Sequence, residues 1–582
     1  MKTRTKIICT IGPASKDVET IINLINAGMN VARLNLSHGS NDQHLEIINN
    51  IKKAREKAHQ PVAILLDTKG PEIRVGDLTQ ESIEVKEKMQ IKLVEKAKAA
   101  DEISVSPFHV LNTITEGMTI LINDGYIVTK VIKKEKDHLI VEVQNLGHIH
   151  SRNKINIPEA YLNLPAMTEQ DKEDLDFACK QDIDIIAASF IRSAEHVLEI
   201  KHLLAKHKKS NIFVMAKIEN KEGIENFDHI VEIADGIMVA RGDLGVEIDL
   251  SLVPQLQKMM IEKTTKRGKP VAIATQMLES MIYNPRPTRA EVSDVANAIY
   301  DSTSLVMLSA ETAMGKYPIE TVKVMKNIIA ATESDFDYFN YFQKESTFGY
   351  SDVSSAVAIA AVKTAYTADA KAIFVFSTSG FTAKLVAHFR PEKIIIALTT
   401  NEKTYHQLAM IWGVVPCYVS KCKNSDDAFK ILAKCAQDKG YVKFGDLIIV
   451  TAGIPFGKKG STNLMRIESI GSILVRGMFG NGTKVQGKSK IIMLSNGHSV
   501  EKCSGNIIII PRCDESYGPL FKVAKGVILQ NSVADVASEN YAISLAQTYE
   551  TPLIVRTDNA MTLIEDDMKI EMDPEQGLIY NA

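Results

Sequence analysis

The sequence has few cysteines and lacks any long hydrophobic run. Its seven cysteines are scattered over 582 residues and include no Cys-x-x-Cys pair, which argues against a disulfide framework and against a cysteine-based zinc site. No apolar run approaches the roughly 20 residues that span a bilayer. Residues 1–4 lead into a predicted strand rather than a signal peptide. The sequence therefore predicts a cytoplasmic protein with reduced thiols and no membrane association.

An excess of charge of one sign is also missing. The chain has 68 basic and 71 acidic residues, a formal net charge of −3 and a pI near 6.6. Because nucleic-acid-binding proteins carry a basic surface, this composition predicts no nucleic-acid partner. A chain of 582 residues is too long for a single hydrophobic core and predicts three or four domains.

Two apolar runs near the middle of the chain end in charged residues. The run that starts at Val214 leads into Lys217 and Glu219, and the run that starts at Met238 leads into Asp243. The segment between them has apolar residues three and four apart, which predicts a strand–helix–strand unit. If the strands are parallel neighbours, the two carboxylates could hold Mg²⁺ beside the ammonium group. Any one of these residues could equally be an ordinary surface charge at the end of a strand.

The same arrangement recurs along the first 310 residues. Segments with helical spacing, such as 18–27, 44–58 and 289–299, separate eight apolar runs. Eight strands that alternate with helices predict an α/β fold, a TIM (β/α)8 barrel, in which the C-terminal strand ends meet at one active site. The predicted strands are 6–9, 30–32, 61–66, 184–188, 214–216, 238–240, 271–274 and 304–308. Their ends carry Thr10, Arg33, Asn35, Asp67, Lys217, Glu219, Asp243 and Thr275.

One long insertion interrupts this spacing after the third predicted strand. Residues 72–164 contain short alternating or β-branched runs, with Asn123, Asp124 and Gly125 as a predicted turn. These runs predict a small inserted β-barrel domain, which could act as a lid that excludes water from the active site. The runs cover 82–85, 89–94, 119–122, 126–132 and 139–143.

A second α/β region follows the barrel. Residues 371–376, 394–398 and 446–450 are predicted parallel strands. The first of them leads into the loop Ser377–Thr382 and a predicted helix at 383–389. Hydroxyl groups and backbone amides at a helix start can bind a phosphate. An ordinary helix capped by Ser or Thr is the alternative interpretation.

Several long motifs resemble those of the pyruvate kinase family. They are Cys9–Ser15, Met29–Gly39, Leu66–Arg74, Lys217–Asn220, Met238–Glu247, Ala274–Ser280, Pro287–Asn297 and Met307–Ala313. The resemblance extends from the N-terminus to about Ile470. It implies phosphoryl transfer from phosphoenolpyruvate to ADP, giving ATP and pyruvate in the last step of glycolysis. It also implies Mg²⁺ (or Mn²⁺) and K⁺ as cofactors, a phosphorylated allosteric effector and a homotetramer.

The resemblance also implies roles for individual residues. The catalytic residues would be Lys217, Thr275 and Arg33, and the same three with Ala240, Gly242 and Asp243 would bind the substrate. Glu219 and Asp243 would bind Mg²⁺, and Asn35, Ser37, Asp67 and the Thr68 carbonyl would bind K⁺, with Glu72 as the residue type of potassium-dependent members. The nucleotide would contact Thr10, Pro13, Asn35, His38 and Arg74. The effector would contact Ser377, Thr378, Ser379, Gly380 and Thr382, near a segment at 453–463 that contains Lys458 and Lys459.

The sequence departs from the family pattern at three places. The family's Lys-Gly-Val-Asn-Leu-Pro-Gly at the end of the lid corresponds here to residues 153–159, and its lysine is displaced by one position to Lys154. Either Arg152 or Lys154 would then take its place on the nucleotide phosphate, or nucleotide binding would be weaker. Residues 302–304, Ser-Thr-Ser, replace a more usual Gly-Thr-Asp, and Ala310 replaces a glycine.

Residues 476–582 form an additional segment. They look like the phosphohistidine domain of phosphoenolpyruvate-utilising enzymes, but the stretch 530–535 lacks the histidine that a phosphoryl carrier needs, and the segment's histidine is His498. A structural or assembly role is therefore predicted. The predicted domains are a barrel (1–71 and 165–345), a lid (72–164), an effector-binding α/β domain (346–475) and this segment (476–582). Two alternatives to a pyruvate kinase are a Mg²⁺-dependent lyase or aldolase and a weakly active metabolite sensor.

Overall fold

The computed structural model describes residues 3–99, 101–347, 352–422, 425–453, 462–471, 473–495 and 499–582. The chain divides into two compact units. Unit 1 comprises Met1–Val362, Val375–Cys422 and Ala452–Asn463, and unit 2 comprises Lys363–Phe374, Lys423–Thr451 and Leu464–Ala582. No helix among the described residues is long and apolar enough to cross a membrane.

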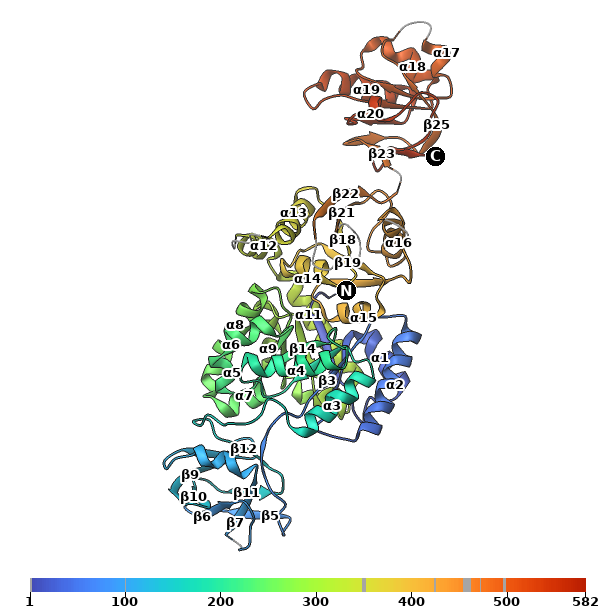
Figure 1. Cartoon of the computed structure of the whole chain (residues 1–582). Coiled ribbons are helices and arrows are strands. Elements are labelled where there is room, and N and C mark those ends of the chain that lie inside the picture. Colours follow the sequence, from blue (N-terminus) through green and yellow to red (C-terminus); the bar gives the residue numbers. More distant parts are fainter. Residues whose placement is uncertain are drawn as a thin grey trace. The chain divides into compact units, whose positions relative to one another are not determined.

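Unit 1 contains the predicted TIM barrel (Figure 1). Its eight parallel strands close in the order β1-β17-β16-β15-β14-β13-β3-β2. The strands are apolar on both faces because helices cover them outside and side chains fill the barrel inside. Their bounds are β1 (Lys6–Thr10), β2 (Met29–Asn35), β3 (Ala63–Asp67), β13 (Ile185–Ala188), β14 (Phe213–Ile218), β15 (Gly236–Ala240), β16 (Val271–Ala274) and β17 (Leu305–Leu308). The prediction of a (β/α)8 barrel is confirmed.

Helices follow the barrel strands as predicted, but the prediction missed α7 and differs from the structure between β14 and β15. The structure has two short helices there, separated at Asn226, whose side chain donates to the Arg192 carbonyl (2.9 Å). The prediction of one helix was therefore wrong. The helices are α1 (Val18–Ala27), α2 (Asn41–Ala58), α3 (Glu169–Lys180), α4 (Ala194–Lys206), α5 (Lys221–Glu225), α6 (Phe227–Ile233), α7 (Arg241–Glu247), α8 (Val253–Lys266), α9 (Arg289–Tyr300), α10 (Ala310–Ala313), α11 (Pro318–Asp335) and α12 (Tyr338–Ser346).

The insertion forms a second closed barrel, as predicted. Seven strands close in the order β10-β6-β7-β4-β12-β8-β9, and β11 pairs with β5. Asn123, Asp124 and Gly125 form the predicted turn, and all three have positive φ. The strands are β4 (Ile73–Val75), β5 (Ser82–Val85), β6 (Gln90–Val94), β7 (Glu102–Ser106), β8 (Thr119–Ile122), β9 (Ile127–Lys134), β10 (His138–Val143), β11 (Gly147–His150) and β12 (Lys154–Asn156). The sequence prediction missed β4, β7, β11 and β12.

The α/β region that follows has a five-stranded sheet of order β20-β19-β18-β21-β22. Three of its strands were predicted, and β20 and β22 were not. Its elements are α13 (Val353–Thr367), β18 (Ala372–Phe376), α14 (Phe381–His388), β19 (Ile394–Thr399), α15 (Glu402–Gln407), β20 (Val414–Tyr418), α16 (Ser425–Asp438), β21 (Leu447–Ala452) and β22 (Leu464–Ser469).

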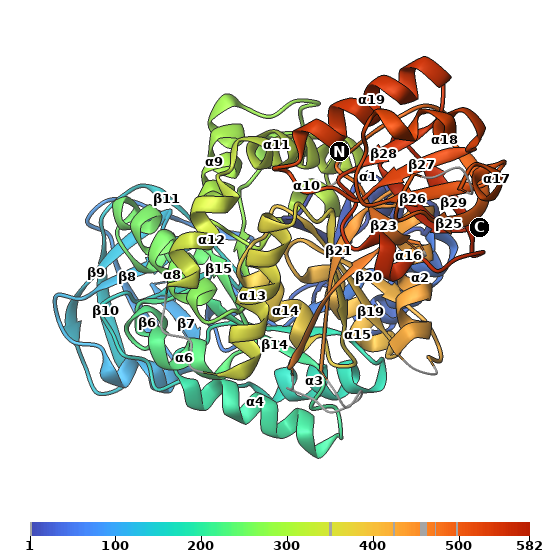
Figure 2. The ribbon, with the colours of Figure 1, turned by 90° about the horizontal axis from the view of Figure 1, so that it is seen from above.

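The C-terminal segment, in unit 2, folds around an eight-stranded sheet of order β23-β30-β29-β25-β26-β27-β28-β24. Alternate residues of β26 face opposite sides: Ile508 and Ile510 pack with the helices α17–α19, and Ile507 and Ile509 pack against α20 and β29. Figure 2 shows α17–α19 together beside the sheet. The elements are β23 (Ile473–Arg476), β24 (Phe479–Asn481), β25 (Val485–Ile491), α17 (Ser499–Cys503), β26 (Ile507–Ile510), α18 (Gly518–Val523), β27 (Gly526–Leu529), α19 (Val536–Tyr549), β28 (Leu553–Val555), α20 (Ala560–Leu563), β29 (Lys569–Asp573) and β30 (Leu578–Asn581).

Two buried histidines of unit 1 make its stability sensitive to acid. Burial lowers the pKa of His406 to about 3 and that of His388 to about 4. Below pH 6.5 the unfolded chain binds protons at these residues and the folded chain does not, so stability falls by roughly 1.4 kcal/mol per histidine and pH unit. Burial also raises the pKa of Asp184 to about 6. Between pH 6 and 4 the folded chain therefore binds a proton at Asp184 that the unfolded chain does not, and this offsets the stability loss caused by about one histidine. The net expectation is a loss of stability on acidification.

The measurement is the thermal unfolding midpoint of the protein and of a His406→Asn variant at pH 7.5 and pH 5.5. Asparagine can still accept the hydrogen bond that Val62 N–H donates to His406 Nδ1 (3.4 Å). We expect the variant to lose less stability than the unchanged protein between these two pH values. Equal losses would show that His406 does not carry this pH dependence.

Candidate active site

The polar ends of neighbouring barrel strands lie side by side. In the strand register, Arg33 pairs with Thr10, Asn35 pairs with Asp67, and Ala187 also pairs with Asp67. Lys217 pairs with Met238 on the next strand. Because all eight strands are parallel, residues at their C-terminal ends reach the same edge of the barrel. The predicted convergence of these side chains is therefore seen in the structure.

A chain of buried polar contacts crosses this edge. The Thr10 hydroxyl accepts a hydrogen bond from Arg33 Nη1 (2.8 Å), and Arg33 Nε donates to Asp67 Oδ2 (2.7 Å). The other Asp67 oxygen lies 3.0 Å from Lys217 Nζ, which also lies 2.9 Å from Glu219 Oε1. The side chains of Asp67 and Glu219 are 1% exposed and that of Lys217 is 11% exposed. The network fixes two cations and two carboxylates away from bulk water.

Two residues of this centre were given no role by the sequence prediction. Ser189 Oγ accepts a hydrogen bond from Lys217 Nζ (2.7 Å) and lies 2.6 Å from the Thr68 carbonyl. Phe190 N–H donates to Glu219 Oε2 (2.6 Å). Phe190 has a φ of 54°, an unusual conformation for a bulky residue. Their place at the end of a predicted strand was the available signal, and their partners could not be predicted from it.

Burial and pairing together set the charges in this network. Burial alone would lower the pKa of the Lys217 ammonium, but Asp67 and Glu219 hold that pKa above its ordinary value. Burial alone would raise the pKa of Asp67, but Lys217 and Arg33 hold it below its usual range. The pKa of Glu219 is raised by burial and by the nearby Asp243 carboxylate, against the attraction of Lys217. Lys217 therefore remains a cation.

The residues present fit a divalent metal at Glu219 and Asp243. Glu219 Oε1 is buried and makes no hydrogen bond within the described residues, apart from its ion pair with Lys217. In the described part of the chain, no group of three or more His, Cys, Asp or Glu side chains is arranged to hold a metal. Mg²⁺ typically binds through one or two carboxylates and completes its shell with water and substrate oxygens, so two carboxylates suffice.

Asp243, Gly242 and Thr275 lie together where α7 begins. The Thr275 hydroxyl accepts a hydrogen bond from Gly242 N–H (3.0 Å), so this amide of the predicted substrate site already has a partner. Thr275 has a φ of 69°, which is rare for a β-branched residue. Arg241, which the sequence prediction left without a role, donates to the Thr275 carbonyl (2.7 Å) and pairs with Asp294 (2.7 Å). This clamp holds the strained Thr275 backbone.

A cavity of about 690 Å³ opens beside this centre. Its volume is in the range that accommodates a drug-sized ligand such as a nucleotide. It is lined by most of the predicted nucleotide residues, namely Thr10, Pro13, Asn35 and His38, together with Arg33 and Thr275. It is also lined by Ala310, one of the departures from the family pattern, and by Lys16, Gln43 and Met314, which were not predicted. Arg74 does not line this cavity; it pairs in the lid with Glu72 (2.8 Å).

The four predicted K⁺ ligands come from the ends of β2 and β3. The Asn35 side-chain oxygen accepts a hydrogen bond from Ser37 N–H (3.1 Å). Asp67 and the Thr68 carbonyl both contact the Ser189 hydroxyl, at 3.1 and 2.6 Å. Because Asn35 and Asp67 are register partners on adjacent strands, the two pairs of residues adjoin. Their side-chain and carbonyl oxygens are the kind of ligand that hard cations bind.

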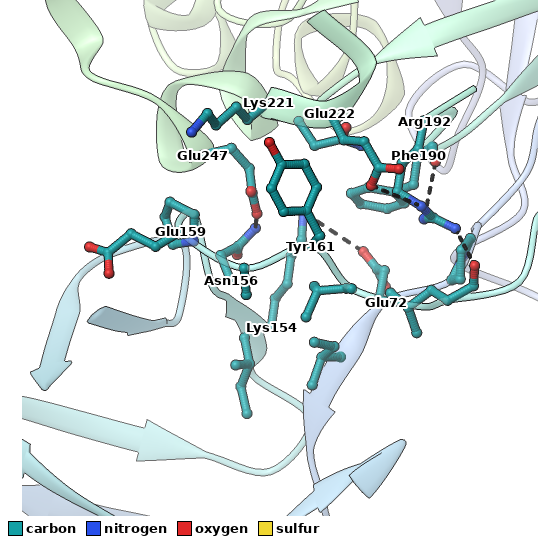
Figure 3. Close-up of a pocket in the computed structure, with 18 residues that line it drawn as sticks. Glu72, Lys154, Asn156, Glu159, Tyr161, Phe190, Arg192, Lys221, Glu222 and Glu247 are labelled. Atoms are coloured by element: carbon teal, nitrogen blue, oxygen red, sulfur yellow. Dashed lines mark hydrogen bonds and ion pairs between the residues drawn. The ribbon is translucent and has the colours of Figure 1, made fainter. Parts of the chain in front are cut away.

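Of the two basic residues considered at the end of the lid, Lys154 is the one that contacts the barrel. Arg152 points to the exposed Asp77 (3.1 Å), whereas Lys154 forms an ion pair with Asp243. Lys154 is one of the residues around a smaller cavity of about 60 Å³ between the lid and the barrel (Figure 3). On the same cavity, Arg192 lies 3.9 Å from Glu222 and donates to the Leu164 carbonyl (2.6 Å).

The predicted effector loop lies between β18 and α14. Gly380, with a φ of 78°, is the N-cap residue of α14, and no side chain makes the capping bond that the alternative interpretation requires. The Thr382 hydroxyl is not available to a ligand in this structure, because it is buried and bonded to the Thr462 hydroxyl (2.7 Å). Lys458, Lys459 and His498 lie outside the described residues.

A (β/α)8 barrel with a buried ammonium, two carboxylates and a nucleotide-sized cavity at one edge has the groups that an enzyme of the phosphoryl-transfer class needs. Family models describe the matching parts as the pyruvate kinase barrel domain, over residues 2–322, and the pyruvate kinase alpha/beta domain, over residues 355–468. The chain is 40% identical to the pyruvate kinase of Geobacillus stearothermophilus and 39% identical to that of Staphylococcus saprophyticus. Each alignment covers 100% of this chain and 99% of the relative.

The chain belongs to the pyruvate kinase family. The predicted activity, phosphoryl transfer from phosphoenolpyruvate to ADP to give ATP and pyruvate, is confirmed by these comparisons. Members of the family generally use Mg²⁺ and K⁺. Because the alignments cover the whole chain, the C-terminal segment is shared with these relatives.

Proposed function

We propose that Lys217 is the residue that stabilises the phosphoryl group during transfer and the enolate that it leaves behind. The observation that carries this proposal is the Lys217 ammonium, which is almost buried and held between Asp67 (3.0 Å) and Glu219 (2.9 Å). Phosphoryl transfer is catalysed mainly by positioning and by neutralising charge. A cation fixed in a site of low dielectric does both without reorganising during the reaction.

The remaining residues complete the same charge pattern. Arg33, oriented by Asp67 and Thr10, would bind the substrate phosphate. Glu219 and Asp243 would hold Mg²⁺, which when bound supplies Lewis-acid neutralisation of the substrate's carboxylate and phosphate oxygens. Ala240 and Gly242 would adjoin the carboxylate. Thr275, beside Gly242, would lie on the route by which a proton reaches the enolate carbon.

The nucleotide would occupy the cavity of about 690 Å³ beside Arg33 and Thr275. Its lining by Thr10, Pro13, Asn35 and His38 supports this assignment. Arg74 does not line this cavity and pairs with Glu72, so that contact would have to break before Arg74 could bind the nucleotide.

We expect activity to depend on K⁺. Asn35, Ser37, Asp67 and the Thr68 carbonyl gather at the ends of β2 and β3, and Glu72 is the residue type of potassium-dependent members. Pyruvate formation should fall by about tenfold or more when tetramethylammonium replaces all K⁺ and Na⁺, a loss of about 1.4 kcal/mol of transition-state stabilisation. Equal rates in the two buffers would contradict the K⁺ site.

The test of the proposed function as a whole is pyruvate formation from phosphoenolpyruvate and ADP with Mg²⁺ and K⁺. Robust turnover by the purified full-length chain is the expected result. A folded protein without turnover, also after addition of sugar phosphates or AMP, would contradict it and would favour the metabolite-sensor alternative.

We also propose a location, an oligomeric state, an effector site and a role for the C-terminal segment. A cytoplasmic homotetramer and a phosphorylated effector at Ser377, Thr378, Ser379 and Gly380 accord with the family. The C-terminal segment would serve structure or assembly, since the loop 530–535 after β27 contains no histidine. Size measurement in solution and effector titration test these proposals.

A further inference from the structure

Lys154 lies one residue beyond the position at which the family motif has its lysine. Successive side chains of a strand point to opposite faces, so a shift of one residue turns a side chain to the other face. The Asn153 side chain donates to Asn123 Oδ1 (3.0 Å) within the lid, whereas Lys154 reaches Asp243 in the barrel. In this chain, Lys154 and not residue 153 therefore crosses from the lid to the active site.

Acidic and aromatic groups surround the Lys154 ammonium. It forms an ion pair with Asp243, lies 4.0 Å from Glu72 Oε1, and lies 4.5 Å from the centre of the Phe190 ring. Figure 3 shows the side chain between the lid and the barrel, close to Glu72. The side chain is 10% exposed. A lysine held between carboxylates in this way is a cation, because their charges favour the ammonium form.

The carboxylates at this edge of the barrel pair with two different lysines. Lys217 is bound by Asp67 and Glu219, and Lys154 is the cation that pairs with Asp243. Asp243 is also one of the two proposed metal ligands. A divalent ion at the Asp243 carboxylate would repel an ammonium that contacts the same group, because like charges a few ångströms apart in a poorly hydrated site interact strongly. Metal binding and the Lys154 contact are therefore in competition.

We propose that Lys154 is a placeholder for the divalent metal: its ammonium occupies Asp243 in the ligand-free enzyme, and metal binding displaces it. This inference rests on the proposed metal site at Asp243. Its consequence is that metal binding breaks an ion pair that joins β12 of the lid to the barrel. The other lid–barrel contacts, such as that of Asn156 with Glu247, remain, and the freed Lys154 ammonium becomes available to an anionic ligand at the active site.

The first test measures the affinity of the full chain for Mn²⁺ in the absence of phosphoenolpyruvate and nucleotide. The concentration of free Mn²⁺ is read from its electron paramagnetic resonance signal. Lys154→Met should bind Mn²⁺ about tenfold more tightly than the unchanged protein, since a charge-assisted contact no longer has to be broken. Lys154→Arg, which keeps the charge, should bind close to the unchanged protein. Lys130→Met removes the same charge from an exposed position on β9 and should have no comparable effect.

The second test is the reactivity of Lys154 itself. Competitive acetylation, read by mass spectrometry of the peptide that contains Lys154, should be slow without metal and several-fold faster when the metal site is saturated with Mg²⁺. Equal Mn²⁺ affinities for the unchanged protein and Lys154→Met, or an equal shift for Lys130→Met, would overturn the placeholder role and leave the metal site intact. Absence of Mn²⁺ binding by the unchanged protein would overturn both this inference and the proposed metal site.

Discussion

Replacement of Lys217 by methionine is expected to lower kcat for pyruvate formation by roughly 10³- to 10⁵-fold, the range seen when a cation that stabilises a transferring phosphoryl group is removed. The KM for phosphoenolpyruvate should change far less, because the proposed contact strengthens in the transition state. Methionine retains most of the volume of the lysine stem. The measurement is steady-state pyruvate formation with saturating Mg²⁺ and K⁺.

The matched control for this substitution is Lys221→Met. Lys221 lies four residues further along the chain, at the start of α5, and its side chain is 54% exposed. Its variant should keep nearly full kcat. A small effect of Lys217→Met on kcat, or a similar loss in both variants, would show that the buried ammonium does not act on the transferring group. Circular dichroism of both variants separates a catalytic loss from unfolding.

The barrel could be predicted from the sequence because its strands are unusual runs of apolar residues. β14 and β15 are largely buried, and short apolar runs separated by regular helical spacers are typical of parallel strands covered by helices. The lid was predicted less completely. β4 and β12 contain three residues each and exist through pairing with strands distant in the sequence. α7 was missed because its sequence contains two glycines, which disfavour a helix.

The kinds of residue at the site could be predicted, but their partners could not. Polar residues recur at the ends of most predicted barrel strands, and this repetition is why Lys217 and Glu219 were found. The contact between Ser189 and Asp67 joins residues 122 positions apart, and the contact between Lys154 and Asp243 joins residues 89 positions apart. Such pairs depend on how the strands close and how the lid folds back, which no local pattern contains.

The second large effect is expected for Glu219→Gln. Glutamine can still accept the hydrogen bond that Phe190 N–H donates to Glu219 Oε2 (2.6 Å), and Lys217 keeps Asp67 as a partner. The substitution therefore removes one anionic metal ligand while it preserves the local fold. Loss of groups that merely orient metal ligands costs roughly 10- to 100-fold in affinity or activity. We expect at least that loss of Mn²⁺ affinity, and an equal or larger loss of kcat.

Glu222→Gln is the control, because Glu222 lies three residues away and faces Arg192 (3.9 Å) on the smaller cavity rather than Asp243. Mn²⁺ affinity should be unchanged in this variant. Mn²⁺ binding also distinguishes the effect of Lys217→Met from that of Glu219→Gln. Lys217→Met should still bind Mn²⁺ although its catalysis is lost. If Glu219→Gln bound Mn²⁺ as tightly as the unchanged protein, Glu219 would not be a metal ligand. Its burial beside Lys217 would then serve only to hold that ammonium in place.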